Sequence, residues 1–100
     1  MKQYRQGDIL LKEIEEITGK QIGKTKRVLA EGSSTGHKHI LTGNGVVFFE
    51  IDNGQIQIYV PNTAKLTHKE HQQITVKKGK YVMVKQREVD LLGVIRQVID

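Results

Sequence analysis

The chain has 100 residues, the usual length of one domain, and no cysteine, which excludes a disulfide framework and any thiolate metal ligand. No apolar run approaches the ~20 residues that span a bilayer. Sixteen Lys and Arg against eleven Asp and Glu give a formal charge of +5, which favours RNA or another phosphate-containing anion as a partner.

These limits predict a soluble, cytoplasmic protein with no membrane partner and with one domain spanning residues 1–100. The first eight residues lack the apolar stretch of a signal peptide. Only two Phe, three Tyr and no Trp are present, so the core must be built mainly from aliphatic side chains. Val and Ile are prominent among them, and their branched side chains favour strands.

In the first third of the chain, the turn-like pair Gly7-Asp8 leads into an apolar run at 9–14, which predicts a strand. Two glycines and two lysines indicate a loop at 18–24. A brief second strand is expected at 27–30. The small and polar residues at 31–36 offer no core face, so we expect this segment to be flexible.

The middle of the chain carries the clearest strand pattern. Three strands are expected, at 37–42, 46–51 and 55–60. They are separated by Gly43-Asn44-Gly45 and Asp52-Asn53-Gly54, which supply the positive φ that tight hairpins need. Pro61, the only proline, is expected to end the third strand. The sequence therefore predicts an antiparallel meander.

The last third predicts another hairpin, with strands at 73–76 and 81–85 joined across 77–80. The tail fits either a helix or a closing strand at 94–99. We favour the strand, because Gly93 weakens a helix and a small barrel needs its edge covered. The fold class predicted is all-β, a small single-domain barrel or roll of about eight short antiparallel strands.

All four histidines fall into two tight pairs, His37-Lys38-His39 and His68-Lys69-Glu70-His71. Imidazole is the commonest metal ligand and titrates near neutral pH, so two such pairs indicate one shared site. On a strand, His37 and His39 point to one face while Lys38 points away. His68 and His71 are three apart and converge only in a helical turn, a loop or a bulge, which would bring Glu70 with them.

Three functions follow from this pattern. The first, which we take as the prediction, is a small hydrolase with a divalent metal (Zn²⁺, Fe²⁺ or Mn²⁺) on the four imidazoles. Glu70, Glu50 or Glu88 would be a further ligand or the base that deprotonates bound water. The metal ligands predicted are His37, His39, His68 and His71.

The second function is a metal-independent ribonuclease that uses the same histidines as general acid and base. Lys38, Lys69 or Arg87 would then stabilise phosphoryl charge, and Arg5 or Arg87 could clamp an anion bidentately. The third is an interaction domain without chemistry. The catalytic residues predicted are Glu70, Arg87 and Lys38.

Five ordered blocks resemble a family of short, uncharacterised proteins of bacteria and their phages. The blocks are Tyr4-Arg5-Gln6-Gly7-Asp8, Ala30-Glu31-Gly32, Thr35-Gly36-His37-Lys38-His39, His68-Lys69-Glu70-His71 and Gln86-Arg87-Glu88. The resemblance covers nearly the whole chain and implies that the four histidines, Arg5, Asp8 and Arg87 belong to the family pattern. It implies no particular activity. Lys69 departs from the pattern, which has an acidic residue there; this removes a carboxylate role at position 69 but leaves one for Glu70.

Overall fold

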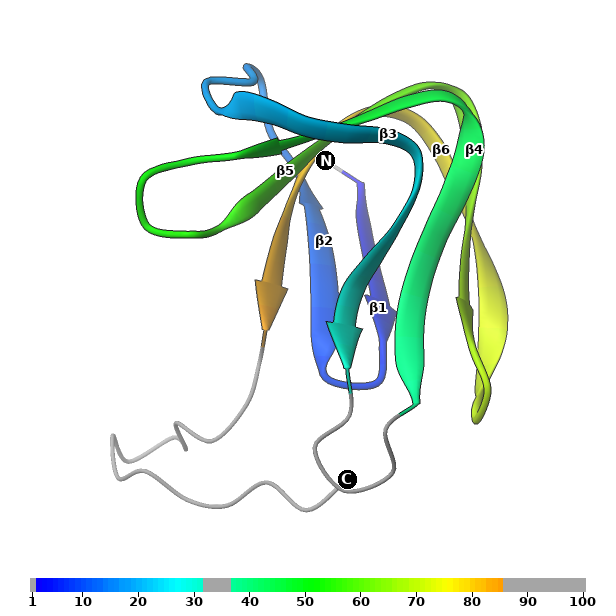
Figure 1. Cartoon of the computed structure of the whole chain (residues 1–100). Helices are drawn as coiled ribbons and strands as arrows, with labels where there is room; N and C mark the ends of the chain where they lie inside the picture. The colour runs from blue at the N-terminus through cyan, green and yellow to red at the C-terminus, as the bar shows by residue number, and fades with distance from the viewer. Residues whose placement is uncertain (1, 32–36, 86–100) are drawn as a thin grey trace.

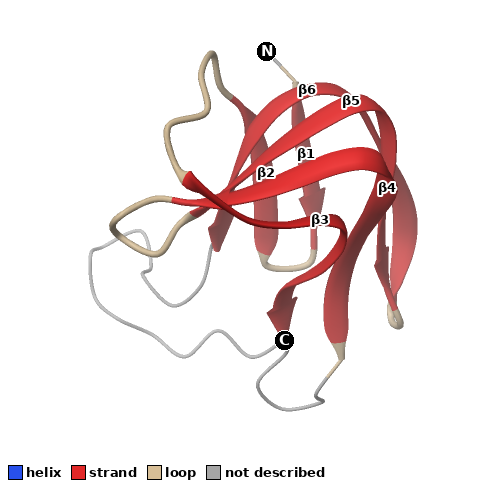
Figure 2. Cartoon of the chain, turned by 45° about the horizontal axis from the view of Figure 1, so that its top comes forward, coloured by secondary structure: helices blue, strands red, loops and turns tan. Residues whose placement is uncertain are grey.

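The computed structural model describes residues 2–31 and 37–85, which form strands, turns and loops (Figures 1 and 2). The six strands are β1 (Gln3–Gln6), β2 (Ile9–Glu13), β3 (Lys20–Glu31), β4 (Lys38–Glu50), β5 (Ile56–His68) and β6 (His71–Lys85). They make one antiparallel sheet in the order β1-β2-β6-β5-β4-β3. The all-β prediction is confirmed, with six strands of unequal length in place of about eight short ones.

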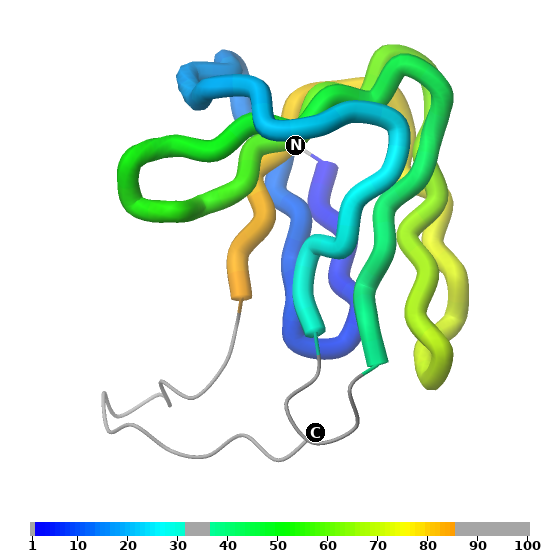
Figure 3. Tube along the Cα trace, in the orientation of Figure 1, coloured from blue at the N-terminus to red at the C-terminus, as the bar shows by residue number. Residues whose placement is uncertain are grey.

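The sheet curls into an open roll, not a closed barrel. In the described part of the chain β1 and β3 are its two edges, since no pairing joins them. The long strands curve over the short β1–β2 hairpin, as the Cα trace shows (Figure 3). Pairing of β2 with β6 attaches this N-terminal hairpin to the last described strand. Segments from opposite ends of the chain therefore lie side by side.

The long strands bend where their pairing slips. Register shifts fall between Thr42 and Val47 in the pairing of β4 with β5, and between Val60 and Thr63 in the pairing of β5 with β6. Such bulges bend a strand and increase its twist. Figure 1 shows β4, β5 and β6 arching over together. At the bend a Cβ on Gly45 would lie 2.9 Å from Cγ of Pro61, so only glycine fits there.

These bends correct three predictions. Neither 43–45 nor 77–80 is a hairpin turn, because β4 and β6 continue through both segments. Pro61 does not end its strand but lies inside β5, where the register slips and a ladder hydrogen bond is dispensable. Gly45 has a φ of 76°, which suits a bulge as well as a turn. The glycines and the proline therefore mark bends in long strands.

The N-terminal third of the chain contains more strand than predicted. β3 begins at Lys20 and runs through most of the predicted 18–24 loop and the predicted 27–30 strand, with three register shifts against β4. β1 was not predicted. The strand expected at 9–14 is confirmed as β2, and the turn at 52–54 is confirmed between β4 and β5, with a φ of 83° at Gly54. The predictions for 32–36 and 94–99 concern residues outside the described ranges.

The core fills the inside of the roll and is largely aliphatic, as predicted. Its fully buried side chains are Ile9, Leu11, Leu41, Val46, Phe48, Ile58, Val60, Leu66, Val76 and Tyr81. Tyr81 donates a 2.6 Å hydrogen bond to the carbonyl of Lys77 and packs edge-on against Tyr4. Residues 2–31 and 37–85 contain no helix that is long and apolar enough to cross a membrane.

Candidate histidine site

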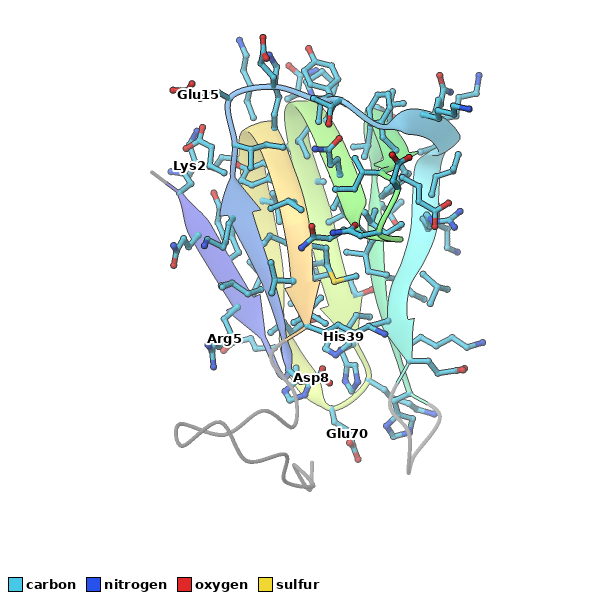
Figure 4. The ribbon with its side chains drawn as sticks, turned by 90° about the vertical axis from the view of Figure 1, so that its left-hand side faces the viewer. Lys2, Arg5, Asp8, Glu15, His39 and Glu70 are labelled. Carbon is cyan, nitrogen blue, oxygen red and sulfur yellow. The ribbon has the colours of Figure 1, made fainter. Side chains whose placement is uncertain are left out.

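The four histidine rings gather at one end of the roll, where β4 begins and β5 turns into β6; His39, Asp8 and Glu70 mark this end in Figure 4. The ring centroid of His68 lies 4.3 Å from that of His39 and 4.5 Å from that of His71. His37 lies 5.8 Å from His68. The two pairs, far apart in sequence, form a single cluster.

Strand pairing explains why the pairs meet. Ile40 of β4 is opposite Thr67 of β5, so the start of β4 lies beside the end of β5. His68 and His71 are themselves a cross-strand pair, joined by the two-residue loop of Lys69 and Glu70. This loop is the bend that His68 and His71 need in order to converge.

The β1–β2 turn closes the site from the side. Gly7 and Asp8 make a two-residue turn, with glycine at the first position and a φ of 60°. A Cβ on Gly7 would lie 2.8 Å from Nε2 of His71 and 3.1 Å from Cε1 of His39. Glycine is favoured here for two reasons: its φ is positive, and two imidazole rings occupy the space that a Cβ would need.

The buried side chain of Gln6 fixes the orientation and tautomer of His39. Its Nε2 donates to the carbonyls of Leu66 and Gln72, at 3.0 and 2.9 Å, so its Oε1 must be an acceptor. That oxygen lies 2.9 Å from Nδ1 of His39. Nδ1 therefore carries the proton, and neutral His39 has its lone pair on Nε2.

Asp8 faces this lone pair. Its Oδ1 lies 3.4 Å from Nε2 of His39, whose ring is almost fully buried. Burial, and then the charge of a protonated His68, lower the pKa of His39, although the Asp8 carboxylate opposes the shift. Two acceptors at this separation repel each other unless a cation or a hydrogen-bond donor lies between them. The geometry therefore leaves two acceptor atoms facing each other, an arrangement that a proton or another cation between them would stabilise.

His68 has the opposite tautomer. The backbone N–H of Glu70 donates to its Nδ1 at 3.0 Å, so the proton of neutral His68 is on Nε2. Partial burial and the neighbouring His71 lower its pKa. A neutral His68 therefore donates from Nε2, whereas a neutral His39 accepts at Nε2.

The outer side of the cluster carries charged groups. Nδ1 of His37 lies 3.3 Å from Oε1 of Glu70, an ion pair when the ring is protonated. Lys38 is exposed and its Nζ lies 3.9 Å from Oε2 of Glu31. Lys69 is exposed in the hairpin loop. Imidazole, carboxylate and ammonium groups thus surround one edge of the site.

Other predicted residues lie elsewhere. Glu50 ends β4, at the far end of that strand from the histidines. Arg5 is exposed on β1. Arg87 and Glu88 are outside the described residues. Gln6 was not predicted; its only signal in the sequence was its place beside Gly7-Asp8, since a single glutamine follows no pattern.

The described residues contain no preformed metal centre. Among residues 2–31 and 37–85, no three His, Asp or Glu side chains are arranged to hold a metal ion as they stand. An open hollow of about 470 Å³ lies against the cluster, with His37 and His68 in its walls. A larger one, about 740 Å³, lies near Lys20, Glu50 and Asp52 and contains no imidazole. We place the candidate site at the histidines because their side chains carry the chemistry.

Comparison with known proteins gives one match. A family model described as a domain of unknown function (DUF8820) matches residues 5–86. Its span includes Gln6, the Gly7-Asp8 turn and all four histidines. No curated protein and no solved structure matches the chain.

Proposed function

The chain belongs to the family of this domain of unknown function, DUF8820, and from its own site we propose that it binds a divalent metal ion through His39, Asp8 and His71. This match confirms the prediction that the chain belongs to an uncharacterised family. That the five ordered blocks are the motifs of this family remains a prediction.

The observation that carries the proposal is the facing pair of His39 and Asp8. Two ligands at about 2.0–2.1 Å from a tetrahedral ion lie roughly 3.3–3.4 Å apart. Nε2 of His39 and Oδ1 of Asp8 are 3.4 Å apart, and Gln6 directs the His39 lone pair outward. A ligating histidine commonly donates its other N–H to a neighbouring acceptor, which fixes the ring. Gln6 would have that supporting role.

His71 is the third ligand that we propose. Its Nε2 and the Cε1 of His39 both lie near the position that a Cβ on Gly7 would take, so its ring borders the His39–Asp8 pair. His71 is exposed at the start of β6, and its ring can rotate toward an ion without disturbing the core. This adjustment is needed because no three-ligand group is preformed in the described residues.

The ligand set proposed omits His68. A metal ion on its Nε2 would require the proton on Nδ1, where the N–H of Glu70 already donates. The ligands are nitrogen and oxygen atoms, a set compatible with Zn²⁺, Fe²⁺ or Mn²⁺. Such an ion acidifies a bound water, which suits a small hydrolase. Glu70 remains the candidate base, and Lys38 the candidate for stabilising developing negative charge.

Calorimetric titration with Zn²⁺ tests the ligand set, with Mn²⁺ and Fe²⁺ in parallel. We expect one ion per chain, and Asp8→Asn and His71→Ala should each weaken binding at least tenfold. Asp52→Asn removes an exposed carboxylate elsewhere and should bind zinc as the unaltered protein does. His68→Gln should also retain binding. Equal affinity for Asp8→Asn and Asp52→Asn would refute the proposal.

A metal-independent ribonuclease is the second candidate, favoured by the unprotonated Nε2 of neutral His39 and by the 3.3 Å contact of His37 with Glu70 in the same cluster. His39 would accept the 2′-hydroxyl proton, and His37, paired with Glu70, would protonate the leaving oxygen. RNA cleavage by metal-free protein, lost in His37→Ala, would favour this candidate over the metal centre.

A further inference from the structure

The hollow beside the histidine cluster has walls from two neighbouring strands. His37 directly precedes β4 and Lys38 begins it, whereas Thr67, His68 and Lys69 come from the end of β5 and its loop. Thr67 ties the walls together by donating a 3.4 Å hydrogen bond to a β4 carbonyl. Its volume, about 470 Å³, lies within the range of small-molecule sites, roughly 300–1,000 Å³.

The charged groups in these walls are cationic. Lys38 and Lys69 contribute two exposed ammonium groups, one from each wall. The contact of Lys38 with Glu31 is 3.9 Å long and about half exposed on both sides, so it holds Lys38 only weakly. Glu70 is the nearby opposing charge, and it lies against Nδ1 of His37.

The imidazole of His68 adds a neutral donor. Its Nδ1 accepts from the N–H of Glu70, so its remaining ring nitrogen donates. Two lysines and one donating ring suit an acceptor-rich anion, and phosphate oxygens accept several such bonds at once. His68 also contacts His39, so a ligand in the hollow would lie one ring away from the His39–Asp8 pair.

We propose that this hollow binds the phosphate group of the substrate, with Lys38 and Lys69 as its two charge contacts. The inference rests on the proposed function, because it names the substrate class of the same site. The phosphate group can belong to a free nucleotide or to an RNA chain. Both present the same chemistry to the lysines, and the experiment separates them.

The test is an NMR titration of metal-free protein in Tris–chloride at fixed ionic strength, with inorganic phosphate, a nucleoside monophosphate and a short single-stranded RNA as probes. We expect saturable shifts in the signals of residues 37–40 and 67–70. Lys38→Gln and Lys69→Gln should each weaken binding about tenfold. Lys65→Gln, an exposed β5 lysine of equal charge, is the control and should bind normally.

The three probes distinguish a free nucleotide from an RNA chain as the source of the phosphate group. A mononucleotide that binds more tightly than inorganic phosphate, with no further gain from RNA, identifies a small-molecule ligand, and a further gain identifies RNA. Shifts centred on the basic cluster Lys24, Lys26 and Arg27, or equal weakening by Lys65→Gln, would overturn the hollow as the site. Absence of saturation by all three probes would overturn it as well.

Zinc titration of the Lys38→Gln/Lys69→Gln double variant separates this inference from the metal proposal. Retained zinc binding together with lost phosphate binding supports both. Zinc binding by the unaltered protein without phosphate binding overturns the hollow alone. Phosphate binding without zinc binding overturns the metal centre, and the hollow then stands as an anion site.

Discussion

Oε1 of Gln6 and Nδ1 of His39 are joined by a 2.9 Å hydrogen bond inside the protein, and this bond decides which nitrogen of the imidazole faces Asp8. The amide of Gln6 cannot be turned around, because its nitrogen already serves two backbone carbonyls. Gln6, which is not a proposed ligand, thus determines that the Nε2 lone pair of neutral His39 faces Asp8.

Replacing Gln6 by methionine keeps the volume but removes three hydrogen bonds. Two backbone carbonyls and the N–H of His39 lose their partner, so the free energy of unfolding should fall by about 2–4 kcal/mol. Zinc affinity should fall about 10–100-fold. Urea unfolding and calorimetry measure the two effects.

Gln57→Met is the matched control for this change. Among the described residues Gln57 is the second buried glutamine, and its amide oxygen accepts two backbone N–H bonds, from Thr18 and Gly19. It should lose stability on the same scale and keep its zinc affinity. An equal loss of zinc affinity in both variants would show that Gln6 acts only through general stability.

Gly7→Ala should destabilise the protein and disturb the site. Alanine is strained at a φ of 60°, and its Cβ meets the rings of His71 and His39. Gly54 has a φ of 83°, and no atom lies within 4 Å of the position that a Cβ would take there. Gly54→Ala therefore introduces backbone strain without a side-chain clash. We expect a cost of about 1–2 kcal/mol for Gly54→Ala and a larger one for Gly7→Ala. Equal costs in urea unfolding would contradict close packing of the rings on the turn.

Stability should fall at acid pH because the pKa values of His39 and His68 are lowered in the folded state. Below about pH 6.5 the unfolded chain takes up protons on these rings more readily than the folded one, so the free energy of unfolding decreases from pH 7 to pH 5. At higher pH both rings are neutral in the folded and in the unfolded chain, so they add no pH dependence to the free energy of unfolding. Urea unfolding of metal-free protein measures the slope, and His68→Gln should flatten it. A free energy of unfolding that increases toward acid pH would contradict the lowered pKa values of His39 and His68.

Removal of metal should lower the melting temperature. Zinc at 100 times its dissociation constant adds about 2.7 kcal/mol to the free energy of unfolding, if it binds only the folded chain. A melt with and without chelator should therefore differ by several degrees. At the same zinc concentration Asp8→Asn, with at least tenfold weaker binding, should gain no more than about 1.4 kcal/mol, so its chelator effect should be about half as large or smaller. A chelator effect of equal size in Asp8→Asn would place the metal elsewhere.

Local patterns identified most of the strands but missed β1, and they did not give the lengths of the long strands. The runs at 37–42 and 46–51 are both strand, yet they are two halves of β4, since a positive-φ glycine serves a bulge and a turn equally well. Which of the two occurs depends on the neighbouring strand, here the stretch of β5 around Pro61. That relation is long-range and leaves no mark in a short window of sequence.

The sequence predicted only those features of the site that depend on local patterns. Period-two geometry placed His37 and His39 together, and the spacing of His68 and His71 required a bend, which the hairpin loop supplies. The roles of Gln6 and Gly7 depend on β1 and β2 packing against strands distant in sequence. A glutamine in a four-residue strand has no periodicity to reveal it.

The bonds of Gln6 span 33, 60 and 66 residues of sequence. Contacts between such distant residues close late, because a long loop loses much conformational freedom when its ends meet. A chain that has formed the β5–β6 hairpin already holds His68 beside His71, but it has no partner for Nδ1 of His39 until the first hairpin docks. The proposed site is therefore complete only when folding is complete, and a nascent chain does not present the proposed cation site before its N-terminal hairpin has docked.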